Sequence, residues 1–155
     1  MASGTRLAAW RQDWPRTGSL IAIVDAGPLY AAADLDDADH ERCVDVLRRR
    51  DLQLVIPALV VAEATYFVGQ RLGAAAEAAF LRGVGELEVE SPVPEDWPRI
   101  AELVERYGDF PLGGTDALVI ALAERMSASV IITLDRRHFA AVRPRHRRAF
   151  DLLPD

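Results

Sequence analysis

Short apolar runs rich in β-branched residues alternate along the chain with longer segments in which apolar residues recur every three or four positions. The short runs predict buried strands at residues 20–24, 52–56 and 130–134, because apolar side chains occupy both faces of each run. A strand with one wet face is predicted over 87–90, and a last extended stretch near 150–153. Strands that alternate with helices and are apolar on both faces predict an α/β fold with a parallel sheet.

The segments between these strands have the periodicity of amphipathic or buried helices. Helices are predicted over residues 38–50, 58–72, about 74–82, 95–107, about 115–127 and about 136–142. The residues Asp-Ala-Gly-Pro at 25–28 follow the first strand and are predicted to form a turn. Residues 1–18 have neither pattern nor the apolar core of a signal peptide. They are expected to be an N-terminal extension, with residues 19–155 forming one domain.

The composition fits a single folded domain. The chain has 155 residues, of which 50% are hydrophobic and 27% are charged, a balance typical of globular proteins rather than disordered ones. No apolar run approaches the roughly 20 residues of a membrane span, so no membrane association is expected. Cys43 is the single cysteine, which excludes an internal disulfide and a cysteine-based zinc site. A reducing, cytoplasmic environment is therefore expected.

All 18 basic residues are arginines, and this excludes several kinds of chemistry. Without lysine there is no Walker A phosphate loop and no Schiff-base lysine. The net charge is −6, yet it is unevenly distributed: residues 1–135 hold 12 arginines and 22 acids, for −10, and residues 136–155 hold 6 arginines and 2 acids, for +4. An acidic chain is unlike a sequence-specific DNA-binding protein, but its basic end can contact a phosphate backbone locally.

Four carboxylates occupy positions where an unpaired negative charge would destabilise the folded chain. Asp25 and Asp135 each follow a predicted buried strand, and in open parallel sheets ligands bind beyond the carboxyl ends of the strands. Glu63 and Asp116 border apolar helical stretches, where an unpaired charge costs free energy. Three of the acids also have a plainer explanation: a turn residue for Asp25, a helix cap for Asp116, and an ion pair with neighbouring arginines for Asp135. Glu63 is the hardest to explain in this way, because no basic residue lies one helical turn away on either side.

If these acids converge, their charges need a counterion. Two like charges about 4 Å apart repel by roughly 4 kcal/mol at an effective dielectric constant near 20. No lysine exists and no histidine is expected nearby, so a hard divalent cation such as Mg²⁺ or Mn²⁺ is the favoured partner of an all-oxygen site. Such sites typically activate a water for attack on a phosphodiester. Thr133 precedes Asp135 by two residues, and its hydroxyl is a candidate to orient a water or a carboxylate.

The contexts of the four acids resemble those of PIN-domain ribonucleases, and in particular the VapC-type toxins of bacterial toxin–antitoxin pairs. The resemblance covers about residues 20–153. The matching segments are IVDAGPL at 23–29, VVAE at 60–63, PLGGTDA at 111–117 and ITLDRRHF at 132–139. Each motif alone is weak, but four in the family's order and spacing are specific.

This resemblance implies a three-layer α/β/α PIN-like domain with a central, mainly parallel sheet. It also implies an Mg²⁺-dependent endoribonuclease toxin that cleaves structured RNA such as tRNA or rRNA, with Mn²⁺ able to substitute. In such a site Asp25 and Asp116 would be the main metal ligands, and Glu63 and Asp135 would complete the set. The implied partners are a VapB-type antitoxin and a second copy in a homodimer. A catalytically silent PIN-like binding module is the alternative.

A basic stretch follows Asp135 directly. Its candidate RNA contacts are Arg136, Arg137, His138 and Arg143, because no acid interrupts residues 136–150 and cations there can contact a phosphate backbone. The alternative is an exposed helix end whose cations interact with the helix dipole.

Overall fold

The computed structural model describes residues 20–155, and its centre is a five-stranded sheet in which every neighbouring pair is parallel. The strands are β1 (Leu20–Val24), β2 (Leu52–Pro57), β3 (Val89–Glu90), β4 (Val130–Ile132) and β5 (Asp151–Leu153). Their order across the sheet is β3-β2-β1-β4-β5. The predicted extension over 1–18 lies outside the described residues.

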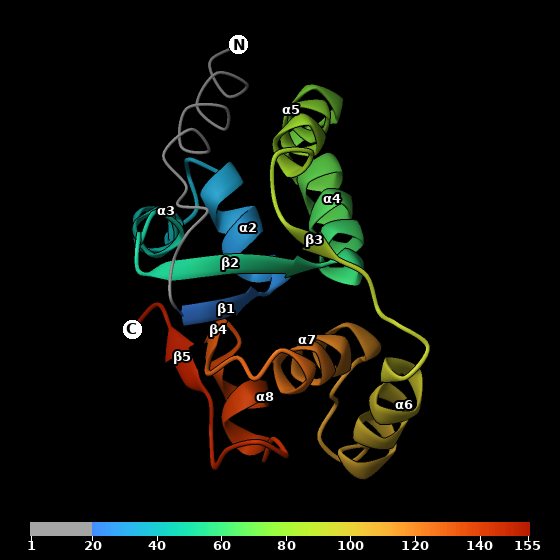
Figure 1. Ribbon diagram of the computed structural model, residues 1–155. Coiled ribbons are helices and arrows are strands. Elements are labelled where there is room, and N and C mark those ends of the chain that lie inside the picture. The colour runs from blue at the N-terminus through green and yellow to red at the C-terminus, as the bar shows by residue number, and fades with distance from the viewer. Residues whose placement is uncertain (1–19) are drawn as a thin grey trace.

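Helices cover both faces of this sheet (Figure 1). One layer contains α2 (Ala26–Ala33), α3 (His40–Leu47), α4 (Ala58–Leu72) and α5 (Ala74–Val84), and the other contains α6 (Asp96–Arg106), α7 (Gly114–Arg125) and α8 (Arg136–Ala141). The predicted three-layer α/β/α fold is therefore confirmed, with a sheet that is wholly parallel. Within the described residues, no helix is both long and apolar enough to cross a membrane.

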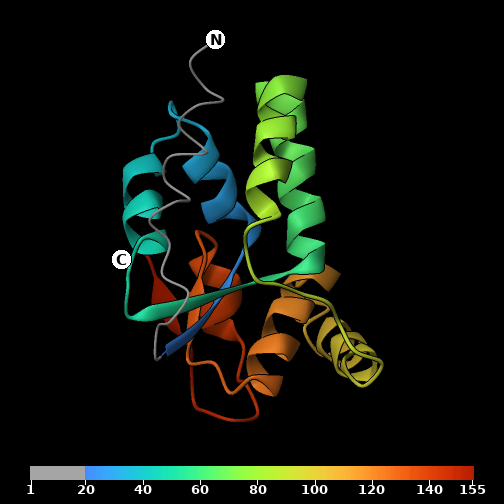
Figure 2. The same cartoon turned by 45° about the horizontal axis from the view of Figure 1, so that its top comes forward.

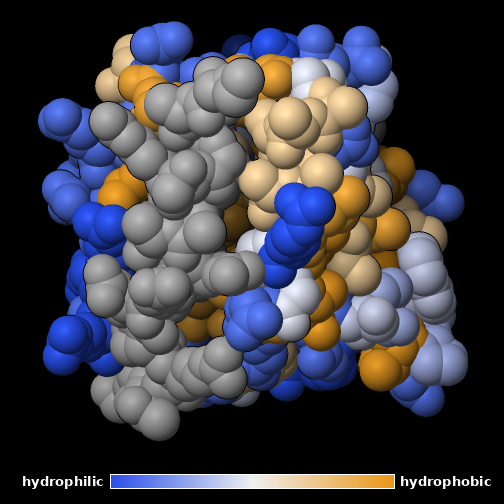
Figure 3. All heavy atoms as spheres, turned by 90° about the horizontal axis from the view of Figure 1, so that it is seen from above, coloured by the Kyte–Doolittle hydropathy of each residue, from blue (hydrophilic) through white to orange (hydrophobic). Residues whose placement is uncertain are grey.

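Burial on both sides explains why the strands and one helix are apolar all round. Ala22, Ile23 and Val24 of β1 are fully buried, because the strand lies in the middle of the sheet between two helical layers. In α7, seven consecutive residues, 117–123, are buried against the sheet and α6. The outer helices have polar faces, and the turn between α4 and α5 presents small apolar side chains beside charged ones at the surface (Figure 3).

The strand order brings two distant chain segments together at one edge of the sheet. The chain passes from β1 through β2 to β3 on one side and returns to place β4 on the other side of β1. Ligands bind in such sheets where the strand order reverses, beyond the carboxyl ends of the strands. Here the backbone N–H of Asp25 donates to the carbonyl of Ile132 at 2.9 Å, so the residue after β1 is held against β4.

The prediction of a simple turn at residues 25–28 is wrong, because α2 begins directly after Asp25. The Asp25 carboxylate accepts the Ala26 N–H at 2.8 Å and so caps the helix. Pro28 lies in the first turn, where its missing N–H breaks no helical hydrogen bond. A Cβ on Gly27 would lie 3.4 Å from Leu134, so the glycine allows α2 to pack closely beside the segment after β4.

Some predicted boundaries also shift. The helix expected over 38–50 is the shorter α3, which leaves the three arginines of residues 48–50 beyond its end. The strand expected over 87–90 contains only two residues, and its ladder is extended by a bond from the Ile56 N–H to the Glu88 carbonyl at 2.9 Å. Figure 2 shows α4 and α5 side by side as a long helical hairpin above this edge of the sheet.

A buried ion pair joins α6 to α7. The Arg99 guanidinium donates to both oxygens of Glu124, at 2.8 and 2.7 Å, and the two side chains are only 8% and 9% exposed. Glu124 also accepts the backbone N–H of Arg145 at 2.9 Å, which ties the segment after α8 to the same point. The pair therefore fixes α7 relative to two neighbouring elements.

Replacing Arg99 with alanine is expected to lower the free energy of unfolding by about 3–5 kcal/mol, because it leaves the Glu124 carboxylate buried without its partner. Urea unfolding measures this loss. The control is Arg49→Ala, which removes an exposed pair with Asp51 and is expected to cost no more than about 1 kcal/mol. Equal losses in the two variants would contradict the structural role assigned to the buried pair.

Candidate active site

Asp25 is the most buried of the four carboxylates, with 7% of its surface exposed. One oxygen caps α2, and the other accepts the Thr133 hydroxyl at 2.8 Å. Thr133 is itself fully buried, and its hydroxyl oxygen accepts the backbone N–H of Asp135 at 2.9 Å. The threonine thus connects the acids that follow β1 and β4, which makes it a positioning residue for the Asp25 carboxylate.

The environment of Asp25 disfavours its negative charge. Burial raises the pKa of Asp25 to about 6, although the hydrogen bonds from Thr133 and Ala26 lower it and offset part of this effect. The negative charges of Asp116 and Glu63 raise it further. A bound cation would relieve both the burial cost and the repulsion.

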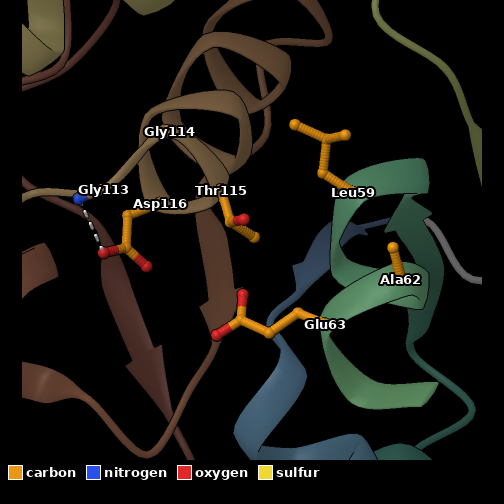
Figure 4. Close-up of a pocket in the computed structure, with 7 residues that line it drawn as sticks. All are labelled: Leu59, Ala62, Glu63, Gly113, Gly114, Thr115 and Asp116. Atoms are coloured by element: carbon orange, nitrogen blue, oxygen red, sulfur yellow. Dashed lines mark hydrogen bonds between the residues drawn. The ribbon is translucent and has the colours of Figure 1, made fainter. Parts of the chain in front are cut away.

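Glu63 and Asp116 face each other from two helices of opposite layers (Figure 4). Glu63 lies in the second turn of α4, and Asp116 lies in the first turn of α7, where its Oδ2 accepts the Gly113 N–H at 3.4 Å. Burial raises the pKa of both carboxyls, and the charge of Asp116 adds to the rise at Glu63. In Figure 4 both carboxylates point into the space between the helices.

Asp135 completes the group together with a histidine. Its Oδ1 caps α8 by accepting the His138 backbone N–H at 3.2 Å. The His138 ring nitrogen Nδ1 lies 2.8 Å from Asp135 Oδ2 and 3.5 Å from Asp116 Oδ2. The expectation that no histidine stands near the acids is therefore wrong. The three-residue separation of His138 from Asp135 was a signal in the sequence for the contact between those two side chains. The contact of His138 with Asp116 depends instead on how α8 packs beside α7.

All four carboxylates line one open cleft of about 570 Å³, into which His138 also faces. A second hollow of about 390 Å³ adjoins it, formed by Leu59 and Ala62 of α4 and by residues 113–115 at the start of α7. Glu63 and Asp116 line both hollows and so stand on the boundary between them. The sequence-predicted acids thus converge, as the strand order requires.

The donor set fits a hard divalent cation. Four carboxylates at one cleft supply only oxygen ligands, as Mg²⁺ and Mn²⁺ prefer. Burial, with repulsion between the acids, raises the pKa values of Asp25, Glu63 and Asp116, and a bound cation would oppose that rise. Within residues 20–155, no three histidine, cysteine or acidic side chains are arranged as ligands of one ion. The side chains would therefore have to close in around a bound cation.

The basic residues after Asp135 lie in different environments. Arg136 donates to the carbonyls of Leu152 and Pro154 at 3.0 and 2.8 Å, so its guanidinium holds the C-terminal strand. Arg137 lies over the Phe110 ring, with its guanidinium carbon 5.3 Å from the ring centroid.

The two other candidates differ again, because His138 stands among the acids and Arg143 is exposed, with its backbone N–H bonded to the Tyr107 hydroxyl at 3.2 Å. Of these four residues, His138 is the one that lines the cleft.

The cleft also contains an arginine that the sequence did not single out. Arg71 lines it together with Tyr30 and Phe67. A signal was present, since Glu63, Phe67 and Arg71 are spaced four residues apart on one helix and so share a face. Tyr30 gave no such signal, because it belongs to α2, which begins in the segment predicted as a turn.

The chain is similar to a known protein family and to a ribonuclease within it. The family model described as "PIN domain" matches residues 22–143. Ribonuclease VapC26 of Mycobacterium tuberculosis is 35% identical over 134 residues, which covers 85% of this chain and 99% of that protein.

Solved structures show the same fold at lower sequence identity. The crystal structure of Mycobacterium tuberculosis VapC20, described as a sarcin-ricin loop cleaving toxin, has a TM-score of 0.65 and 18% identity over 71% of this chain and 86% of that one. VapBC2 of Rickettsia felis, bound to a DNA fragment from its promoter, has a TM-score of 0.65 and 15% identity over 87% of this chain and all of that one.

The buried charge of Asp25 predicts a pH-dependent gain in stability for Asp25→Asn in metal-free protein. A pKa raised on folding means that ionised Asp25 destabilises the folded state, so the penalty is absent below about pH 4 and grows as pH rises to about 6. Above that range the variant is expected to be more stable by up to about 3 kcal/mol. Urea unfolding at pH 4 and pH 7.5 measures the difference.

The exposed Asp36 provides a matched control, because Asp36→Asn makes the same chemical change outside the cleft. Its effect should be similar at the two pH values. A loss of stability in Asp25→Asn at pH 7.5 would contradict the interpretation that burial of this charge is costly.

Proposed function

Because this chain belongs to the PIN-domain family and, within it, to the VapC ribonuclease toxins, we propose that it is a metal-dependent endoribonuclease of a type II toxin–antitoxin pair. The observation that carries this proposal is the convergence of Asp25, Glu63, Asp116 and Asp135 in one cleft. Clustered carboxylates need a cation to balance their charge, and a divalent cation held there can act on a phosphodiester.

In this proposal the four acids hold Mg²⁺, with Asp25 and Asp116 as the main ligands and Mn²⁺ able to substitute. The bound ion would polarise the phosphodiester and lower the pKa of a water. Thr133 fixes the rotamer of Asp25 through its 2.8 Å hydrogen bond, and it also holds the backbone of Asp135. His138 would orient Asp135, because its Nδ1 lies 2.8 Å from Asp135 Oδ2.

The relatives support a proposal for the substrate and the partners. The description of VapC20 as a sarcin-ricin loop cleaving toxin supports structured RNA, tRNA or rRNA, as the substrate class. The VapBC2 complex supports a VapB-type antitoxin as partner, and we extend the proposal to a homodimer acting in the cytoplasm, where such RNA is found. Of the basic candidates, Arg137 and Arg143 keep the role of RNA contacts, because the Arg136 guanidinium is bonded to backbone carbonyls.

Antitoxin-free protein is expected to cut total bacterial RNA into discrete fragments with Mg²⁺ or Mn²⁺ and to lose this activity in EDTA. Asp116→Asn should lower the cleavage rate by on the order of 100-fold or more, because it removes a charge that acts directly on the reacting centre. Gel analysis of the RNA fragments measures both effects. Asp109→Asn is the matched control, since it changes an acid seven residues earlier that does not line the cleft.

The alternative, a catalytically silent PIN-like binding module, predicts a different result from the same preparation. The folded, antitoxin-free protein would cut no RNA at any metal concentration, and a titration with millimolar Mn²⁺ would detect no uptake. Metal-dependent cleavage that survives unchanged in Asp116→Asn would instead show that the acidic cleft is not the site of reaction.

A further inference from the structure

The cleft that contains the four acids has a second, chemically different end. Tyr30, Phe67 and Arg71 line it there. Phe67 and Arg71 follow Glu63 along one face of α4, one and two helical turns further on. Tyr30 comes from α2, which lies beside α4 in the same layer (Figures 1 and 2).

Arg71 is held there by two aromatic rings rather than by a carboxylate. Its guanidinium carbon lies 5.0 Å from the centroid of the Tyr30 ring and 5.3 Å from that of Phe67. The Tyr30 hydroxyl donates to Asp34 at 2.6 Å, which fixes the orientation of the ring. Arg71 forms no ion pair with any acid of residues 20–155. Its positive charge is therefore positioned but not neutralised by a partner carboxylate.

We propose that Arg71, positioned by Tyr30 and Phe67, binds a phosphate of the RNA strand to one side of the position that is cleaved. The inference rests on the ribonuclease function proposed above. The guanidinium carbon lies over both rings, and the Arg71 side chain also hydrogen-bonds with that of Tyr30. A guanidinium has five N–H donors in one plane, a geometry that matches a phosphate bidentately. Eight residues separate Glu63 from Arg71, about 12 Å along the helix at 1.5 Å per residue, so Arg71 suits a phosphate further along the strand.

The negative charge of the cleft means that RNA needs a cation nearby in order to bind, and Arg71 is placed to provide it. Four acids repel a polyanion, so an RNA strand that reaches them needs a fixed cation close by. Two of the arginines near the C-terminus are paired with acids: Arg145 with Glu102 at 2.5 Å, and Arg147 with Asp151 at 3.2 Å. Arg137 and Arg143 are not among the residues that line the cleft. Among the described residues that line the cleft, Arg71 is the only arginine.

A purely structural role is the competing explanation, since a cation in the last turn of α4 also interacts favourably with the helix dipole. The two explanations differ in one measurable respect. An arginine that contacts a phosphate displaces counterions from RNA, so its loss makes binding less dependent on salt. A structural arginine would change the unfolding temperature but not the salt dependence of binding.

Binding is best measured in the Asp116→Asn background, which is expected to slow cleavage during the experiment. The probe is a fluorescently labelled single-stranded RNA of mixed sequence, titrated in Mg²⁺ buffer at several salt concentrations. Arg71→Gln is expected to weaken binding about 10-fold, as for the loss of one charged hydrogen-bonded contact. The slope of log K against log salt should fall in magnitude by about 0.7, the value for one phosphate of a single strand.

Arg106→Gln is the matched control, because Arg106 also lies in the last turn of a helix and over a ring, that of Tyr107 at 5.9 Å, but it does not line the cleft. It should leave both the affinity and the salt slope unchanged. Arg71→Lys keeps the charge and is expected to keep the slope. Weaker binding in both Arg71 variants, with an unchanged salt slope and a lower unfolding temperature, would indicate a structural residue and overturn the proposal.

Two further outcomes would also overturn it: Arg71→Gln binding like the Arg106 control, or no RNA binding by the parent protein. The ribonuclease function is tested separately, by cleavage with the unmutated protein. Absence of cleavage together with Arg71-dependent RNA binding would reject the proposed activity and leave this contact standing. Cleavage by the unmutated protein, together with unaltered RNA binding in Arg71→Gln, would support the ribonuclease activity and reject the Arg71 contact.

Discussion

The position of Asp25 is the constraint on which the site depends. Its carboxylate is buried at the carboxyl end of β1, next to β4, because the strand order places those two segments side by side. Burial and nearby acids raise its pKa, yet it accepts hydrogen bonds from Ala26 and Thr133 that hold it in one orientation. The fold thus keeps a costly charge in place, which is the arrangement expected where a cation is to be bound rather than where stability alone is at stake.

The two ends of α7 differ in their electrostatics: the first turn contains a carboxylate that other acids repel, and the last turn contains a carboxylate in an ion pair. Asp116 occupies the first turn of α7, where its charge adds to the repulsion, and Glu124 lies near the end of α7 in a buried pair with Arg99. The pair fixes α7 against α6, and Arg145 adds a third element. These contacts anchor α7 near its C-terminal end, while Asp116 in its first turn faces Glu63 even though the two charges disfavour each other.

Much of the fold and the acidic set could be predicted because both produce local signals. Buried parallel strands are apolar on both faces, and an acid beside such a run is conspicuous, as at Asp25 and Asp135. The features that escaped prediction depend on context beyond one segment. Gly27 and Pro28 are typical of turns, yet a carboxylate cap and a close approach to Leu134 make them part of a helix. The contact of His138 with Asp116 arises only when α8 packs beside α7.

All the basic residues of the chain are arginines, whose positive charge does not depend on pH in the physiological range. A protein of net charge −6 can still bind RNA, because salt screens charges beyond about 8 Å at physiological ionic strength and leaves local groups to decide. Burial raises the pKa of Asp25 to about 6, so the charge of the acidic end varies with pH. A guanidinium does not lose its proton in this range. Arg71 therefore supplies a constant positive charge at one end of a cleft whose other end changes with pH and with bound cation.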